Sequence, residues 1–419
     1  MDYQKIQKDN YNLHIIKTDK FKTVNVLFNF KRKIEKNEIV IRNLLNDILI
    51  NSCSKYKTSR EIEIETQELY DLGISSRPYK SGNYHIMSYK VTFLNEKYTE
   101  DNMTIKSLEF MLDLIFKPNI VNNGFDKEYY DILKNSIKED INGLKDKPKK
   151  YSLTRLYEIM DEGPLSYRSS GYIENLKNLN EKKLYEYYKD VINNDIIDIF
   201  IIGDIKEDYT NIFDKYIPNN KRNNCELSHF LNLKIDEEKE IKETIKNNQS
   251  NLSIGLKTDN LTDFELKYVM PLYSLVLGGN PNSKLFQNVR EKNSLCYHIS
   301  SSVSTIAKII TIVAGINKEN YSKTIKLIKQ ELDNMKKGNI LDIEINEAKK
   351  IYIAGCNEVY DSPMGIINNY LSNEYTGLDL VEDRIKNIKK VTKEDIVEFA
   401  EKVHIDTIFL LEGDLDNGA

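Results

Sequence analysis

The chain repeats itself, and this internal repeat restricts its possible folds more than any other feature of the sequence. Thr104–Ile120 (TIKSLEFMLDLIFKPNI) and Thr324–Ile340 (TIKLIKQELDNMKKGNI) are identical at eight of seventeen positions. Composition alone would give about one or two identities. In the first copy Leu108, Met111 and Ile115 recur at helical spacing, which predicts an amphipathic helix in both copies.

A second pair of segments follows in the same order. Ile173–Val191 and Ile385–Val403 share their apolar positions, and the two pairs are offset by 220 and 212 residues. Each copy then enters an apolar strand that ends in Gly-Asp, at Asp204 and at Asp414. Two long matches at similar offsets favour a duplication over chance in a chain rich in Lys, Ile and Asn.

The repeat predicts two tandem homologous domains of the α+β class. We place them at residues 1–217 and 250–419, joined by a polar linker at 218–249 that contains one strand. Each domain should be a mixed, mainly antiparallel sheet with helices packed on one face. In the first domain we expect a hairpin over Leu13–Phe30, followed by helices over Ile39–Ile50 and Ser59–Leu72.

Charge and composition exclude several classes of protein. A net charge of −5 offers no basic footprint for nucleic acid, and Lys147–Lys150 (KPKK) is short enough to be solvated surface. No run approaches the roughly eighteen apolar residues of a membrane-spanning helix, and the N-terminal segment MDYQKIQKDNYN has no apolar signal core. We expect a cytoplasmic protein with no membrane span and no nucleic-acid partner.

The residues that could carry hydrolytic chemistry are scattered. The four cysteines form no CxxC pair, which predicts buried or free thiols in a reducing compartment. The five histidines show no HxxH or HxxxH spacing, and neither a phosphate loop nor a GxSxG motif occurs. A self-sufficient hydrolase is not expected. These residues are Cys53, Cys225, Cys296, Cys356, His14, His85, His229, His298 and His404.

One block of the second half carries a recognisable pattern. Gly278–Ser302 (GGNPNSKLFQNVREKNSLCYHISSS) places Arg290 and Tyr297 seven residues apart, and an apolar strand follows at Ile309–Ile316. This pattern resembles the C-terminal half of the M16 (insulinase, pitrilysin and mitochondrial-processing) peptidases. The resemblance implies two tandem LuxS/MPP-like domains, and it implies that Arg290 and Tyr297 donate to the carbonyl of a peptide substrate.

The zinc motif of that family is missing from the first half. The family carries His-x-x-Glu-His on its first helix, where the two imidazoles bind zinc and the glutamate acts as general base. In this chain the two ligand positions are Asn43 and Asp47, and the base position is Asn46. The helix of the last ligand corresponds to Asp126–Ile141, with Asp140 as the nearest match. An amide is a poor zinc ligand and no general base, so we expect this chain to bind no metal.

The retained and lost residues together lead to two hypotheses. In the first, the chain is the zinc-free, non-catalytic subunit of a heterodimeric M16-type metallopeptidase, inactive alone. A paralogue with HxxEH would then supply the zinc, and this chain would supply Arg290, Tyr297 and part of a peptide-binding chamber. In the second, the chain is a scaffold or peptide-binding protein without a catalytic contribution. Pro78, at the strand edge that the family offers to extended substrates, would weaken strand addition in this half.

Overall fold

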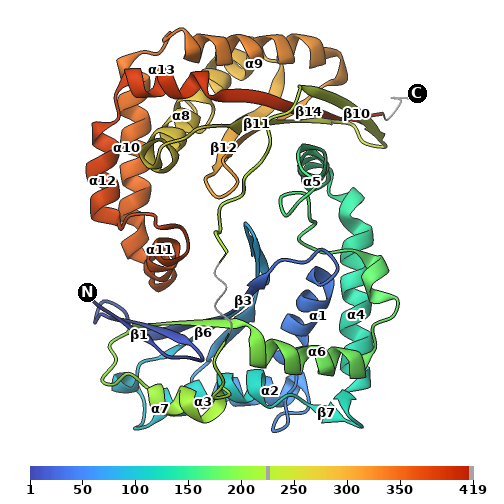
Figure 1. Cartoon of the computed structure of the whole chain (residues 1–419), viewed down its shortest axis with the longest axis vertical. Helices are drawn as coiled ribbons and strands as arrows, with labels where there is room; N and C mark the ends of the chain where they lie inside the picture. The colour runs from blue at the N-terminus through green and yellow to red at the C-terminus, as the bar shows by residue number, and fades with distance from the viewer. Residues whose placement is uncertain (223–226, 415–419) are drawn as a thin grey trace. The chain divides into compact units, whose positions relative to one another are not determined.

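The computed structural model describes residues 1–222 and 227–414, which form two compact units (Figure 1). The units are assembled from separate stretches of the chain. Unit 1 contains the described residues of Met1–Gly143, Arg168–Leu227 and Ser362–Asn368, and unit 2 those of Leu144–Tyr167, Ser228–Asp361 and Asn369–Ala419. The boundaries predicted at residues 217 and 250 separate the two repeated halves of the sequence, whereas the compact units are defined by contacts. The predicted boundaries therefore stay a prediction. Within the described part of the chain, no helix has both the length and the apolar character needed to cross a bilayer.

Unit 1 is built on a seven-stranded mixed sheet with the order β1-β2-β9-β3-β6-β4, in which β5 also pairs with β6. Only β2 and β9 run parallel. The expected hairpin over Leu13–Phe30 is wrong, because β9 lies between β2 and β3. All eight residues of β9 are buried, and a strand of that kind favours a central place in the sheet. The strands are β1 (Asp2–Gln7), β2 (Asn12–Lys17), β3 (Thr23–Lys33), β4 (Gly73–Ser76), β5 (Tyr79–Ser81), β6 (Tyr84–Leu94) and β9 (Ile196–Gly203), with a separate ribbon of β7 (Ile120–Val121) and β8 (Gly124–Phe125).

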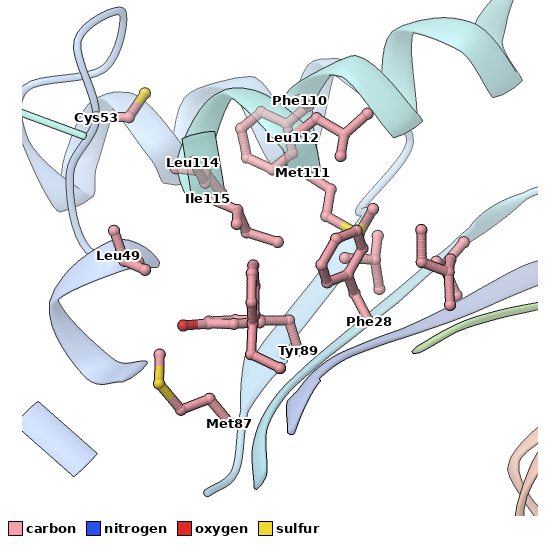
Figure 2. Packing of buried hydrophobic residues seen from close by; sticks show 14 of the residues in the cluster. Phe28, Leu49, Cys53, Met87, Tyr89, Phe110, Met111, Leu112, Leu114 and Ile115 are labelled. Carbon is pink, nitrogen blue, oxygen red and sulfur yellow. The ribbon is translucent and has the colours of Figure 1, made fainter. Parts of the chain in front are cut away.

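The helices of unit 1 pack on one face of this sheet. Figure 2 shows the buried side chains between them, with Phe28, Met87 and Tyr89 of the sheet facing Met111 and Ile115. The predicted helices are confirmed, although α2 ends at Glu68, before Tyr70 and Asp71, which adopt positive φ. The helices are α1 (Ile39–Leu49), α2 (Ser59–Glu68), α3 (Met103–Phe116), α4 (Lys127–Asn142), α6 (Glu181–Asn194) and α7 (Thr210–Tyr216).

Unit 2 is built on a five-stranded sheet with the order β10-β14-β11-β13-β12, in which only β10 and β14 run parallel. The strand expected within the linker is β10. The strands are β10 (Lys239–Ile245), β11 (Ser250–Thr258), β12 (Cys296–Ser304), β13 (Ile309–Ile316) and β14 (Val403–Gly413). The helices are α5 (Pro148–Met160), α8 (Met270–Leu277), α9 (Tyr321–Lys336), α10 (Asp342–Glu358), α12 (Val381–Lys390) and α13 (Lys393–Glu401), with π-helical turns η4 (Glu265–Val269) and η5 (Phe286–Glu291). Residues of α11 (Pro363–Thr376) are divided between the two units.

The two sheets repeat one topology, as the duplicated sequence predicts. Without β1, the order β2-β9-β3-β6-β4 of unit 1 corresponds position by position to the order in unit 2. A buried lysine–aspartate pair also recurs on equivalent strands. Lys31 Nζ of β3 lies 3.4 Å from Asp198 Oδ2 of β9. Lys257 Nζ of β11 lies 2.7 Å from Asp406 Oδ1 of β14. The prediction of two α+β domains with mixed, mainly antiparallel sheets is therefore confirmed.

Helix α5 is the part of the fold that the sequence did not predict. It lies between α4 and α6 of unit 1 along the chain, yet it packs in unit 2 against β11 and β14. Helices α8, α9 and α13 contact the other face of that sheet (Figure 1). Gly255 of β11 makes room for α5, because a Cβ there would lie 2.1 Å from the sulfur of Met160. The side chains of Ser152 and Ser253 form a buried hydrogen bond of 2.8 Å beside it.

Candidate functional site

The residues at the zinc-ligand positions lie on α1, which packs against α4. Asn43 and Asp47 are one helical turn apart, so they project from the same side of α1. Burial raises the pKa of the Asp47 carboxyl, and Asp140, near the end of α4, adds to that shift, so the two carboxyl groups lie within electrostatic range of each other.

Asn43 is engaged in a directed chain of hydrogen bonds. Arg42 Nε donates to His85 Nδ1 at 3.0 Å, so the imidazole proton lies on Nε2. That nitrogen lies 3.2 Å from Asn43 Oδ1 and donates to it, and Asn43 Nδ2 donates to the carbonyl of Ser169 at 2.8 Å. His85 is 1% exposed and Asn43 is 9% exposed. The Asn43 amide thus links α1 to two other parts of unit 1. Its oxygen binds His85 of β6, and its nitrogen binds Ser169 in the loop before α6.

The two remaining positions of the motif on α1 are also occupied by groups unsuited to zinc. Asn46 is fully buried, and within the described residues neither atom of its side-chain amide has a hydrogen-bond partner. Burial raises the pKa of Asp47, while a 3.2 Å hydrogen bond from Ser76 Oγ partly opposes that shift. Desolvation therefore disfavours the anion that a metal would need.

The chemistry of this donor set does not fit the zinc ion that the fold family implies. The site offers amides at two positions, one of them fully engaged by protein groups, and two carboxyl groups that repel each other. Across residues 1–222 and 227–414, no three His, Cys, Asp or Glu side chains cluster closely enough to share a metal ion. We derive no hydrolytic step from these residues.

The buried imidazole of His85 makes unit 1 sensitive to acid. Burial, the Arg42 guanidinium and then Lys80 lower the pKa of His85 well below its usual value near 6.5. As the pH falls, His85 is therefore protonated in the unfolded chain before it is protonated in the folded chain. The contribution of neutral His85 to the free energy of unfolding is fully present above about pH 6.5 and is lost as the pH falls below that value. We expect a loss of about 1.4 kcal/mol per pH unit from His85 below that pH, down to its folded pKa.

Urea unfolding between pH 5 and pH 8 measures this loss, with His85→Gln as the comparison. The variant should be less stable at pH 8 but should show a shallower decline below pH 6.5. The range from about pH 7.5 to pH 8 is the internal control, because His85 is almost entirely neutral there in both states. Equal slopes for the two proteins below pH 6.5 would contradict the assignment.

Arg290 and Tyr297 meet at one pocket in unit 2. Arg290 lies in the π-helical turn η5, and Tyr297 lies at the start of β12, 63% exposed. The Tyr297 hydroxyl donates to Asn317 Oδ1 at 3.2 Å. Both side chains line a cavity of about 420 Å³, together with Glu291, Ser294, Leu295, Cys296, Asn317 and Asn320. The predicted pair is therefore placed on a common surface that a ligand can reach.

Local backbone features aim Tyr297 into this pocket. The pairing of β12 with β13 shifts between Cys296 and His298, so Tyr297 is the extra residue of a β-bulge. Bulges of this kind reorient a side chain at the edge of a sheet.

The Gly278–Gly279 pair upstream allows the backbone to approach β12 closely. The carbonyl of Gly278 accepts the Ser301 N–H at 3.0 Å, and a Cβ on Gly278 would lie 2.9 Å from that nitrogen.

The edge strand of unit 1 agrees with the expectation for Pro78. Strand β4 forms the edge of the sheet, and Arg77 N–H points inward to the carbonyl of Ser88 at 2.9 Å. Because backbone N–H groups alternate in direction along a strand, the next N–H would point outward. Pro78 has none, so the open edge lacks a donor at that position.

A buried ionic cluster beside α1 was not predicted from the sequence. Asp195, between α6 and β9, accepts from Arg32 at 2.6 Å and lies 2.8 Å from Arg42. Arg42 is 1% exposed. The only sequence signal for it was an arginine within the otherwise apolar run of Ile39–Ile50. Asn317 and Asn320 were missed as well, because the loop between β13 and α9 carries no motif.

Comparison with known proteins shows similarity in sequence and in fold. The family model described as the peptidase M16 inactive domain matches residues 178–352. A protein of Bacillus subtilis named probable inactive metalloprotease YmfF is 28% identical over 409 residues, covering 96% of this chain and 95% of the relative. The crystal structure of a conserved protein from Enterococcus faecalis superposes with a TM-score of 0.92 at 27% identity, covering all of both chains. That of a peptidase M16 inactive domain from Pseudomonas fluorescens has the same fold, with a TM-score of 0.81 at 15% identity over both whole chains.

The repeated sheets, the Arg290–Tyr297 pocket and the altered zinc motif are thus accompanied by likeness to one family over the whole chain. The chain is similar to the inactive members of the M16 peptidase family.

Proposed function

We propose that this chain is the zinc-free, non-catalytic subunit of a two-chain M16-type metallopeptidase of the cytoplasm. A paralogue that keeps HxxEH would bind the zinc ion, and this chain would contribute Arg290 and Tyr297 to the bound peptide. The observation that carries the proposal is a contrast within the molecule. The residues at the zinc positions are held by the fold, whereas Arg290 and Tyr297 share one open pocket.

The two retained side chains suit this task chemically. A guanidinium and a phenol are both hydrogen-bond donors, and both can stabilise negative charge that develops on a substrate carbonyl oxygen. Neither group needs a metal on its own chain. The Arg290 side chain is 39% exposed, and the Tyr297 hydroxyl makes a long hydrogen bond of 3.2 Å to Asn317, so both can turn to a ligand.

The proposal is tested by purifying the chain alone and with its HxxEH paralogue. Alone, the chain should contain well under one zinc ion per molecule by elemental analysis and should cleave no peptide. With the paralogue it should co-purify, and the pair should cleave peptides faster than the paralogue alone. Stoichiometric zinc with robust cleavage by this chain alone would refute the proposal. A stable pair whose activity is no higher than that of the paralogue would favour a scaffold.

A further inference from the structure

The pocket of Arg290 has a size and lining that fit the end of a peptide. Its volume of about 420 Å³ lies at the lower end of ligand-binding cavities. Its walls combine the side chains of Leu295 and Cys296 with polar groups from η5 and from the turn before α9. One terminal residue can therefore enter with its polar end group against η5.

The Arg290 guanidinium is oriented by contacts that leave most of its donors available. It stacks on the ring of Phe286, 4.5 Å from the ring centroid, and this contact uses no N–H group. Within the described part of the chain its one ionic partner is the neighbouring Glu291, 3.5 Å from Nε and itself half exposed. An exposed pair of this kind is weak. The two terminal nitrogens thus present the fork that binds a carboxylate in bidentate fashion.

Positive groups other than the Arg290 guanidinium lie near the pocket, although the Glu291 carboxylate also lines it. The charged groups that act on His298, the next residue after Tyr297, are Lys149 of α5 and Arg290. The sixteen-residue helix α9 begins just after Asn320, so its positive end lies at the pocket wall. A neutral carbonyl needs one donor and gains little from such a field, whereas a carboxylate gains from all of it.

The edge of β12 favours a chain end over the middle of a chain. Beyond Ile299 the outward N–H of Ser301 is already bonded to the Gly278 carbonyl. The backbone of a peptide along this edge can therefore form hydrogen bonds with β12 only beside Tyr297 and Ile299. A peptide with so few pairing positions fits best when its last residue lies in the pocket.

We infer that the pocket of Arg290 and Tyr297 binds the free C-terminal carboxylate of a peptide. This inference rests on the proposed function and specifies its substrate class as short peptides with an accessible C-terminus. Arg290 holds the two carboxylate oxygens, and Tyr297 donates to one of them. Asn317 is the positioning residue, because it accepts the Tyr297 hydroxyl in the free protein.

Affinity selection with three pools of degenerate hexapeptides tests the inference on the full chain without a partner. The first pool has free C-termini and lacks Asp and Glu, the second is identical but amidated, and the third is amidated with one internal Glu. Retained peptides are quantified by mass spectrometry. We expect the free-acid pool to be retained at least about ten-fold more than either amidated pool.

Arg290→Gln should abolish this preference, whereas Lys292→Ala, which removes a neighbouring exposed cation, should keep it. Thermal unfolding of both variants checks that they fold. Equal retention of acid and amide pools would overturn the inference, as would a preference that survives Arg290→Gln. Retention of the internal-Glu pool equal to the free-acid pool would overturn the assignment to the C-terminus.

The outcome separates this inference from the proposed function. If acid and amide bind equally but Arg290 still controls turnover of the two-chain enzyme, the carboxylate site is wrong and the subunit role stands. If the acid preference depends on Arg290 but turnover does not, the carboxylate site stands and the catalytic contribution is wrong.

Discussion

Replacing Arg290 by alanine should lower the turnover of the reconstituted two-chain enzyme by about 10²- to 10³-fold, the usual cost of one donor to a developing oxyanion. Formation of the pair should be unchanged, because the side chain lines a pocket and its one ionic contact among residues 1–222 and 227–414 is weak. Turnover is measured at saturating peptide, and pair formation is measured by titration of one labelled subunit.

Tyr297→Phe removes the hydroxyl but keeps the ring, so it should reduce turnover with no change in folding. The double variant should lose less than the product of the two single effects, because both donors act on the same bound group of the substrate. Lys292→Ala is the matched control, because Lys292 is an exposed cation on the same segment and contacts Asn288. Full turnover in the double variant would leave the scaffold hypothesis as the better account.

Replacing Asp195 by alanine should destabilise unit 1 by about 3–5 kcal/mol, the cost of leaving a buried charge without its partner. Arg42 is 1% exposed and its buried carboxylate partner is Asp195. Arg32 keeps Asp190 at 2.6 Å, so the loss falls mainly on Arg42. The Asp195 side chain is itself fully buried, so water cannot replace it without disrupting the core.

Hydrogen exchange read by mass spectrometry can measure this loss separately in each unit. The free energy of opening should fall for the amides of β9 in unit 1 and should stay near the wild-type value for β14 in unit 2. Asp131→Ala is the control, because it breaks an exposed pair with Lys127 on α4 and should change stability by less than about 0.5 kcal/mol.

The double variant Arg42→Met/Asp195→Ala separates loss of the pair from loss of packing. It should be more stable than Asp195→Ala alone, because no charge is left buried. The coupling free energy between the two positions should lie at the upper end of the usual 0.5–3 kcal/mol, as an order of magnitude. Additive effects would show that Arg42 is held mainly by Phe30 and His85 instead.

Several elements of the fold could be predicted because their signals are local. The amphipathic spacing of Thr104–Ile120 and Thr324–Ile340 identified α3 and α9, and the apolar run Ile309–Ile316 identified β13. Helix periodicity and strand composition act over a few residues, so one sequence suffices to read them. The pairing of β2 was not local, and the hairpin prediction failed for that reason.

Some features of the candidate site could likewise be predicted from the sequence, and others could not. Spacing placed Arg290 and Tyr297 in one motif, and residue type ruled Asn43 and Asn46 out as a zinc ligand and a base. The bulge at Tyr297 could not be predicted, because it depends on how β12 pairs with β13. The part played by His85 could not be predicted either, since its partners lie 42 and 43 residues away.

The sequence by itself determined the duplicated α+β architecture, the position of the helix that lacks zinc ligands and the pair of donors in the second half. The architecture follows from periodicity and self-similarity, and the other two rest on the resemblance to the M16 family together with residue chemistry, none of which needs knowledge of contacts. The tertiary structure alone decided that β9 separates β2 from β3, that α5 packs in unit 2 and that Asn43 is tied to His85. Those outcomes depend on burial of apolar faces and satisfaction of buried polar groups by residues far apart in the chain, and only the folded chain brings these together.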